Sequence, residues 1–193
     1  MVGVQCPPCK ELSKYHRLKE PGVDHLSLCF ELYNPEYFQK YCPGKYRTLT
    51  QQAFFDAMEY ASKLWGKGRV SGEIIAGIEP IEDTLKAIDY ITSVGAFPTI
   101  CVFRPTLGTE MEDYPSPKYE DMTKIFRRMY ESLIKNNIPI GIAPNIHVSL
   151  VVQPTEGKYF IEQKNLSYYR YQLQLSLLKM VFRPLFRLKM MFH

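Results

Sequence analysis

The chain has 193 residues, of which 46% are hydrophobic and 23% are charged, an ordinary balance for one globular domain. Extensive disorder is therefore not expected, and the formal net charge of +4 is too small to indicate a nucleic-acid partner. Five cysteines are present, an odd number, and two of them lie in apolar strand-like runs, which argues against a disulfide framework and favours a cytoplasmic protein. The first residues lack the basic and apolar regions of a signal peptide, and no apolar run is long enough to cross a membrane.

Strands and helices alternate along most of the chain. Apolar and alternating runs predict strands over 2–6, 25–31, 69–80, 98–105 and 138–145. Helical spacing predicts helices within 7–22 and over 50–65, 81–94 and 118–136, and residues 34–47 are expected to be a loop with one helical turn. This alternation predicts an α/β fold with parallel strands and outer helices, about half of an eight-unit (β/α) TIM-type barrel.

The composition changes after this partial barrel, which is predicted to comprise residues 1–152. Residues 153–193 are expected to form a C-terminal helical extension, broken near Pro184, in which residues 164–193 are apolar, aromatic and basic. We prefer the interpretation that this helix packs on the barrel with its basic face in solvent. Peripheral contact with an anionic membrane, or with a partner, is the alternative.

The first predicted strand begins directly after Met1, with no strand–helix unit before it. A parallel sheet that starts in this way has an unpaired edge. The pattern predicts that the chain is the carboxy-terminal part of a longer barrel, and the missing amino-terminal half-barrel is one expected partner.

Polar residues follow several of the predicted strands. Glu31 ends one strand, Glu79 and Arg104 follow the next two, and Asn145 follows the last. Ligands of parallel α/β proteins bind beyond the carboxyl ends of the strands, so these side chains are expected to meet at one end of the sheet. A carboxylate, a glycine that allows close backbone approach, here Gly77, and an arginine suit a polar cofactor with a ribose and an amino-acid moiety. Pairing of Glu31 with a lysine or arginine inside the barrel is an equally open alternative.

Three segments resemble consecutive strand regions of radical S-adenosylmethionine (radical SAM) enzymes of the biotin synthase-like branch. They are LCFELYNPEYF, VSGEIIAGIEPIEDTLKAIDYI and PTICVFRPTLGTEMED, and the resemblance extends over residues 2–152. It implies a partial barrel from an enzyme that reductively cleaves S-adenosylmethionine to a 5′-deoxyadenosyl radical. That radical would abstract hydrogen from a small organic substrate.

The resemblance also implies which residues contact the cofactor. Glu31 would bind the ribose or the methionine end of S-adenosylmethionine, Val102 would contact adenine, and Glu79 would close the loop. The complete predicted set is Ser27, Glu31, Gly72, Ile74, Gly77, Glu79 and Val102. From their places at strand ends, we add Arg104, Asn145 and His147 as predicted substrate contacts, and a solvated loop histidine is the alternative for His147.

One feature of the family is missing from this sequence. Radical SAM enzymes hold a 4Fe-4S cluster on a Cys-x-x-x-Cys-x-x-Cys segment, whereas Cys6 and Cys9 give only Cys-x-x-Cys. A zinc or iron–sulfur site that adds Cys29 and Cys42 to this pair is disfavoured, since zinc ribbons pair two Cys-x-x-Cys knuckles. A redox role for the pair is also less favoured than a plain loop. No metal ligand is therefore predicted.

The chain would accordingly supply cofactor and substrate contacts without the cluster ligands. Two alternatives stay open. One is a non-catalytic half-barrel that serves as a binding or interaction module through its basic tail. The other is a (β/α) enzyme with an unrelated ligand.

Overall fold

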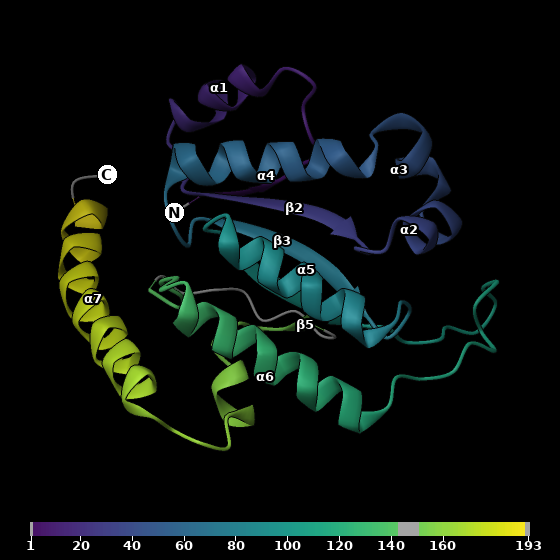
Figure 1. The fold of residues 1–193 in the computed structure, drawn as a ribbon. Coiled ribbons are helices and arrows are strands. Elements are labelled where there is room, and N and C mark those ends of the chain that lie inside the picture. The colour runs from purple at the N-terminus through teal and green to yellow at the C-terminus, as the bar shows by residue number, and fades with distance from the viewer. Residues whose placement is uncertain (1, 143–150, 192–193) are drawn as a thin grey trace.

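The structure, a computed structural model, describes residues 2–142 and 151–191, with side chains as far as residue 188. Its centre is an open five-stranded sheet in the order β1-β2-β3-β4-β5 (Figure 1). The first four strands are parallel, and β5 is antiparallel to β4. Their bounds are β1 (Gly3–Gln5), β2 (His25–Glu31), β3 (Val70–Ala76), β4 (Phe97–Val102) and β5 (Val151–Val152). The predicted fold class, a partial barrel of parallel strands with outer helices, is confirmed.

Three long helices cover one face of this sheet: α4 (Gln51–Trp65), α5 (Ile81–Ser93) and α6 (Tyr119–Lys135) (Figure 1). The predicted start of α4 is confirmed, because the Thr50 hydroxyl accepts the backbone N–H of Ala53 at 3.3 Å. The helix ends at Gly66, whose φ of 89° is a conformation that glycine adopts without strain. Beneath the helices, Leu26, Leu28 and Phe30 of β2 are fully buried.

Gly72 of β3 allows the helices to pack closely on the sheet. A Cβ at this position would lie 2.8 Å from Met58 Cε of α4 and 3.0 Å from Ile91 of α5. Gly72 therefore faces the helical side of the sheet, and the core between β3, α4 and α5 has no room for a larger residue there.

Shorter helices connect these elements: η1 (Leu12–Tyr15), α1 (His16–Lys19), α2 (Pro35–Tyr41), α3 (Pro43–Thr48) and η2 (Gly157–Phe160). Residues 34–47 are thus more helical than the single turn expected. Asn34 caps α2, since its Oδ1 accepts the N–H groups of Glu36 and Tyr37 at 3.0 and 3.2 Å. Proline begins both α2 and α3, a position where its missing N–H costs nothing.

The strand predicted over 138–145 is wrong for residues 138–142, which form no strand, and residues 143–145 lie outside the described chain. Pro139 has no N–H to donate to a neighbouring strand, and Gly141 has a φ of 62°, which is incompatible with an extended strand. The described chain instead returns to the sheet at β5, which runs antiparallel to β4.

The C-terminal helix α7 (Leu166–Met191) continues through Pro184, so the predicted break is wrong. A proline removes the hydrogen bond to the carbonyl four residues earlier, here Met180. Met180 is 67% exposed, so water can satisfy the released carbonyl and the helix can continue. Among the described residues, no helix has both the length and the apolar character needed to span a membrane. The division at residues 152 and 153 stays a prediction.

Candidate functional site

The face of the sheet opposite the helices carries polar side chains, which the strand register arranges in layers. The lowest layer consists of Ser27, Ser71 and Phe97. The next layer consists of Cys29, Glu73 and Thr99. Ile75 and Cys101 follow toward the carboxyl ends of the strands. The charge of Glu31 acts on the thiols of Cys29 and Cys101, so its carboxylate also lies at this end.

Glu31 occupies an unusual backbone position. The register between β2 and β3 shifts between Cys29 and Glu31, and Glu31 has a φ of 69°, in the left-handed region that residues with a side chain seldom adopt. Lys45 Nζ of α3 lies 2.5 Å from Glu31 Oε1 and 2.8 Å from the carbonyl oxygen of Cys29. The alternative that Glu31 pairs with a lysine inside the partial barrel is therefore confirmed. The two side chains keep 20% and 34% exposure, so a ligand can still reach the pair.

Glu73 lies between the thiols of Cys29 and Cys101 on the neighbouring strands. The Cys101 thiol donates to Glu73 Oε1 at 3.7 Å, and Gln5 Nε2 contacts the Cys29 sulfur. Burial, and then the charge of Glu73, raise the pKa of each thiol to about 12. Both cysteines are therefore protonated thiols at neutral pH, and neither is poised as a nucleophile.

Thr99 adds a hydroxyl to this face. It is 9% exposed, and its Oγ1 has no hydrogen-bond partner among the described residues. A buried hydroxyl without a partner is costly, and a bound ligand can supply the missing partner. Glu31, Glu73 and Thr99 thus offer oxygen acceptors, and Thr99 also offers a donor, to a ligand that has hydroxyl or amino groups.

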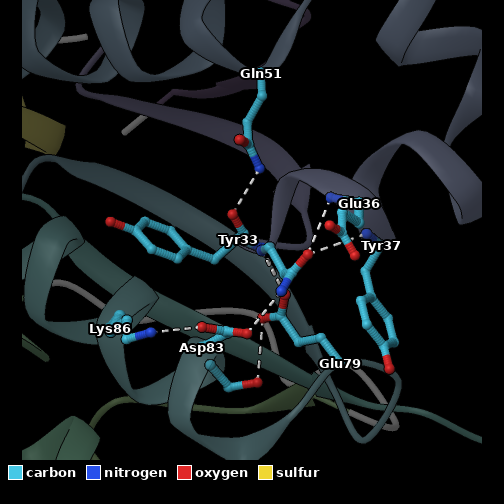
Figure 2. Close-up of polar contacts among 9 residues, drawn as sticks. Tyr33, Glu36, Tyr37, Gln51, Glu79, Asp83 and Lys86 are labelled. Atoms are coloured by element: carbon cyan, nitrogen blue, oxygen red, sulfur yellow. Dashed lines mark hydrogen bonds and ion pairs between the residues drawn. The ribbon is translucent and has the colours of Figure 1, made fainter.

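Glu79 has a different environment, in the loop between β3 and α5. It is 6% exposed, and its Oε2 accepts the backbone N–H groups of Tyr33 and Asn34, each at 2.8 Å (Figure 2). Its Oε1 accepts the hydroxyl of Thr84 at 3.2 Å. Burial raises the pKa of Glu79, and these three hydrogen bonds partly offset that effect. The carboxylate therefore joins the loop after β2 to the loop after β3.

Neighbouring contacts reinforce this junction (Figure 2). Asn34 Nδ2 donates to Asp83 Oδ2 at 2.8 Å, and Lys86 pairs with Asp83 at 2.8 Å. Gln51 Nε2, from the start of α4, donates to the carbonyl oxygen of Tyr33 at 2.9 Å. The loops that follow β2 and β3 are thereby held to α4 and α5.

The other predicted cofactor residues are distributed over both faces of the sheet. Ser27 lies on the open face. Gly72 and Ile74 lie on the face that the helices cover. Val102 pairs with Ala76, two residues after Ile74 on β3, so it belongs to that same helical face. Gly77 has a φ of 102°, and a Cβ there would lie 2.2 Å from Pro117 Cγ. Its place is thus set by a tight approach of two loops.

The predicted substrate residues are less well defined. Arg104 is exposed beyond the end of β4, and Asn145 and His147 lie outside the described residues. The contacts predicted for all ten residues with cofactor or substrate stay predictions.

Four residues at the open face are not among the contacts predicted from the sequence: Lys45, Glu73, Thr99 and Cys101. The pattern gives no clear signal for Glu73, because both alternating sets of residues on its strand are largely buried and do not show which set faces the helices. The signal for Lys45 was absent, since its approach to Glu31 depends on the helical path of residues 35–48.

The described residues contain no cluster of three or more histidine, cysteine, aspartate or glutamate side chains placed to hold a metal ion. All five cysteines are free thiols. The residues described here therefore do not fit a 4Fe-4S cluster, which is held by several thiolates.

Comparison with known proteins adds the following. No protein-family model matches the chain. A bacteriochlorophyllide c C-7(1)-hydroxylase from Chlorobaculum limnaeum is 28% identical over 127 residues, which cover 65% of this chain and 31% of the hydroxylase. Coproporphyrinogen III oxidase (HemN) from Escherichia coli, a radical SAM enzyme, has a similar fold with a TM-score of 0.51 and 16% identity. That match covers 69% of this chain and 32% of the oxidase. The chain therefore spans about a third of the length of the proteins that it matches.

Proposed function

The chain resembles radical SAM enzymes in its sequence motifs and in its fold, and on this basis we propose that it forms the S-adenosylmethionine- and substrate-binding part of such an enzyme. The observation that carries the proposal is the accessible carboxylate of Glu31, held in a strained left-handed backbone at the carboxyl end of β2. A strained residue persists only where its surroundings hold it, and such residues cluster at binding and catalytic sites.

The residues of the open face suit part of S-adenosylmethionine. The Glu31 carboxylate can accept hydrogen bonds from the ribose hydroxyls or from the methionine amino group. The Thr99 hydroxyl, which has no partner among the described residues, can bind a further polar atom of the ligand. Lys45 orients Glu31 through its bonds to Oε1 and to the Cys29 carbonyl oxygen, and leaves the carboxylate accessible.

The cluster chemistry of the family is not assigned to these residues. In the parent family, the cluster supplies the electron that cleaves the carbon–sulfur bond of S-adenosylmethionine. Because the described thiols do not fit a cluster, the role proposed for this chain is to bind and orient the cofactor and the substrate.

The hydroxylase relative supports a substrate class. Its name identifies a bacteriochlorophyllide, a tetrapyrrole macrocycle, as the molecule on which that enzyme acts. We propose a tetrapyrrole of this kind as the substrate for the present chain, bound on the open face beyond the carboxyl ends of the strands.

Calorimetric titration of the chain with S-adenosylmethionine tests the first part of the proposal. We expect saturable binding, and a loss of about tenfold or more in affinity for Glu31→Gln, since a hydrogen bond to a charged group is removed. Lys45→Met should weaken binding in the same direction, because Glu31 would lose its orienting partner. Glu59→Gln, an exposed change on α4, serves as the control. Equal affinities for Glu31→Gln and the control would refute the assigned role of Glu31.

A non-catalytic binding module is the second candidate. The Glu31–Lys45 ion pair favours it, since it satisfies the carboxylate without any ligand. The same titration separates the two functions, because a module of this kind should show no affinity for S-adenosylmethionine. An absorbance titration with a chlorophyllide then tests the proposed substrate class independently.

A further inference from the structure

Helix α7 lies beside the rest of the protein (Figure 1), and its amino-terminal half provides most of the contacts that attach it. The Tyr171 hydroxyl donates to the carbonyl oxygen of Ile138, and Gln172 Nε2 donates to the Tyr130 hydroxyl of α6. Tyr171 and Leu175 are the buried side chains that α7 contributes to the described core. After Leu175, most of the described side chains of the helix are exposed.

One side of α7 carries an apolar stripe that faces away from this attachment. With 3.6 residues per turn, positions three and four apart share a side of a helix. The outer stripe consists of Leu166, Tyr169, Leu173, Leu177, Met180 and Leu188, which are 51–75% exposed. It extends for about 33 Å along the helix, at 1.5 Å per residue. An apolar patch of this length on a surface helix indicates that another surface covers it.

The charge of the segment identifies the kind of surface. Residues 164–193 contain six lysines and arginines and no aspartate or glutamate, whereas the rest of the chain has 18 basic and 20 acidic residues. In helical projection, Arg183 and Arg187 border the outer stripe on one side and Arg170 borders it on the other. Long cationic side chains beside an apolar stripe can extend toward anionic headgroups while the apolar residues enter the lipid boundary.

The side of α7 that faces the body is also only partly filled. Its carboxyl-terminal half borders a cavity of about 850 Å³ at the amino-terminal end of the sheet. Leu178, Phe182 and Leu185 line this cavity from α7, and His25 and Phe97 line it from the sheet. The carboxyl-terminal half of α7 is therefore not held by a packed core.

We propose that α7 is an interfacial helix that binds the chain to an anionic lipid bilayer, with the outer stripe in the headgroup region and the arginines on the lipid phosphates. The helix lies along the membrane and does not cross it, in agreement with the lack of a membrane-spanning helix in the part of the chain that the structure describes. This surface is separate from the open face of the sheet, so the proposal does not depend on the function proposed above.

Co-sedimentation with lipid vesicles tests this proposal with the 193-residue chain. We expect the chain to pellet with phosphatidylcholine vesicles that contain phosphatidylserine, to pellet far less with phosphatidylcholine alone, and to be released by high salt. Substitution of Leu173, Leu177 and Met180 together by serine should lower the partition coefficient about tenfold or more. Leu107→Ser, an equally apolar change on an exposed loop, should leave the coefficient unchanged.

A second variant tests the electrostatic part. Arg183→Gln with Arg187→Gln should reduce binding to the anionic vesicles about tenfold or more, while Lys10→Gln with Lys63→Gln, on the body of the protein, should not. These arginines are exposed, so this variant carries the test even if the serine variant fails to fold, which far-UV circular dichroism would reveal.

Three results would overturn the proposal. The first is no sedimentation with either type of vesicle. The second is equal, salt-insensitive binding to both types, which would indicate unspecific apolar adhesion. The third is a defined dimer, measured by light scattering, that the serine substitutions dissociate, because a second copy of the chain would then cover the stripe.

Discussion

Glu79 allows a quantitative test of the junction between the loops after β2 and β3. Glu79→Ala removes the acceptor of two backbone N–H groups, those of Tyr33 and Asn34. Each unsatisfied buried donor costs about 1–3 kcal/mol, and the substitution leaves two of them. Because Tyr33 and Asn34 are partly exposed, water can reach these donors in part, so we expect a loss of about 2–4 kcal/mol in the free energy of unfolding. Urea denaturation followed by circular dichroism measures it, with Glu82→Ala, an exposed carboxylate in the first turn of α5, as the control. Equal losses in the two variants would refute the argument.

The same site has a predictable pH dependence. Because burial raises the pKa of Glu79, the folded state binds this proton more tightly than the unfolded chain does. The contribution of Glu79 to stability is therefore complete below its ordinary pKa of 4.5 and decreases as the pH rises through the raised value. Glu79→Gln keeps one acceptor oxygen and cannot titrate, so we expect it to lose less stability than the alanine variant. The difference in stability between wild type and Glu79→Gln should shrink from acidic to neutral pH.

Three further predictions concern the sheet. Gly72→Ala should lower the free energy of unfolding by about 1–3 kcal/mol, because the added methyl group overpacks the core. Chemical denaturation should show little change for the control Gly44→Ala, where a Cβ would meet nothing within 4 Å. Iodoacetamide at mildly alkaline pH should alkylate Cys29 and Cys101 much more slowly than free cysteine, because the pKa of both thiols is raised to about 12. Rapid labelling of either cysteine in the folded protein, measured by peptide mapping, would contradict this expectation. Burial lowers the pKa of His25 below its ordinary value of 6.5, so the neutral imidazole stabilises the fold above pH 6.5 and this contribution to the free energy of unfolding decreases as the pH falls. Urea titrations at several pH values should show a weaker pH dependence for His25→Gln than for the wild type.

Much of the fold could be predicted from the sequence because its signals are local. The helix from Thr50 to Trp65 has a cap, an apolar face and a terminating glycine, and all three are in the structure. The strand at 25–31 has an unambiguous alternation of apolar and polar residues. The end of the sheet was harder to predict, because the run at 138–142 is apolar like a strand and only the conformations of Pro139 and Gly141 exclude one.

The candidate site was predictable only in part. The position of Glu31 at the end of a strand can be read from the pattern, and so can its expected pairing with a basic residue. The identity of that residue cannot, since Lys45 reaches Glu31 through two short helices that the sequence only faintly indicates. On β3, both alternating sets of residues are largely buried, so periodicity did not show that Glu73 faces the open side and Ile74 the helices.

The left-handed backbone of Glu31 also limits how position 31 can change by mutation. Glycine would relieve the strain but would remove the carboxylate, and asparagine and aspartate tolerate this conformation but have side chains one methylene shorter. β-Branched residues, which suit every other part of a strand, are the least tolerated at such a φ. Glycine and asparagine would therefore improve folding but remove the carboxylate, and aspartate would keep the carboxylate but shorten its reach, so stability and ligand binding are opposing demands on a single residue.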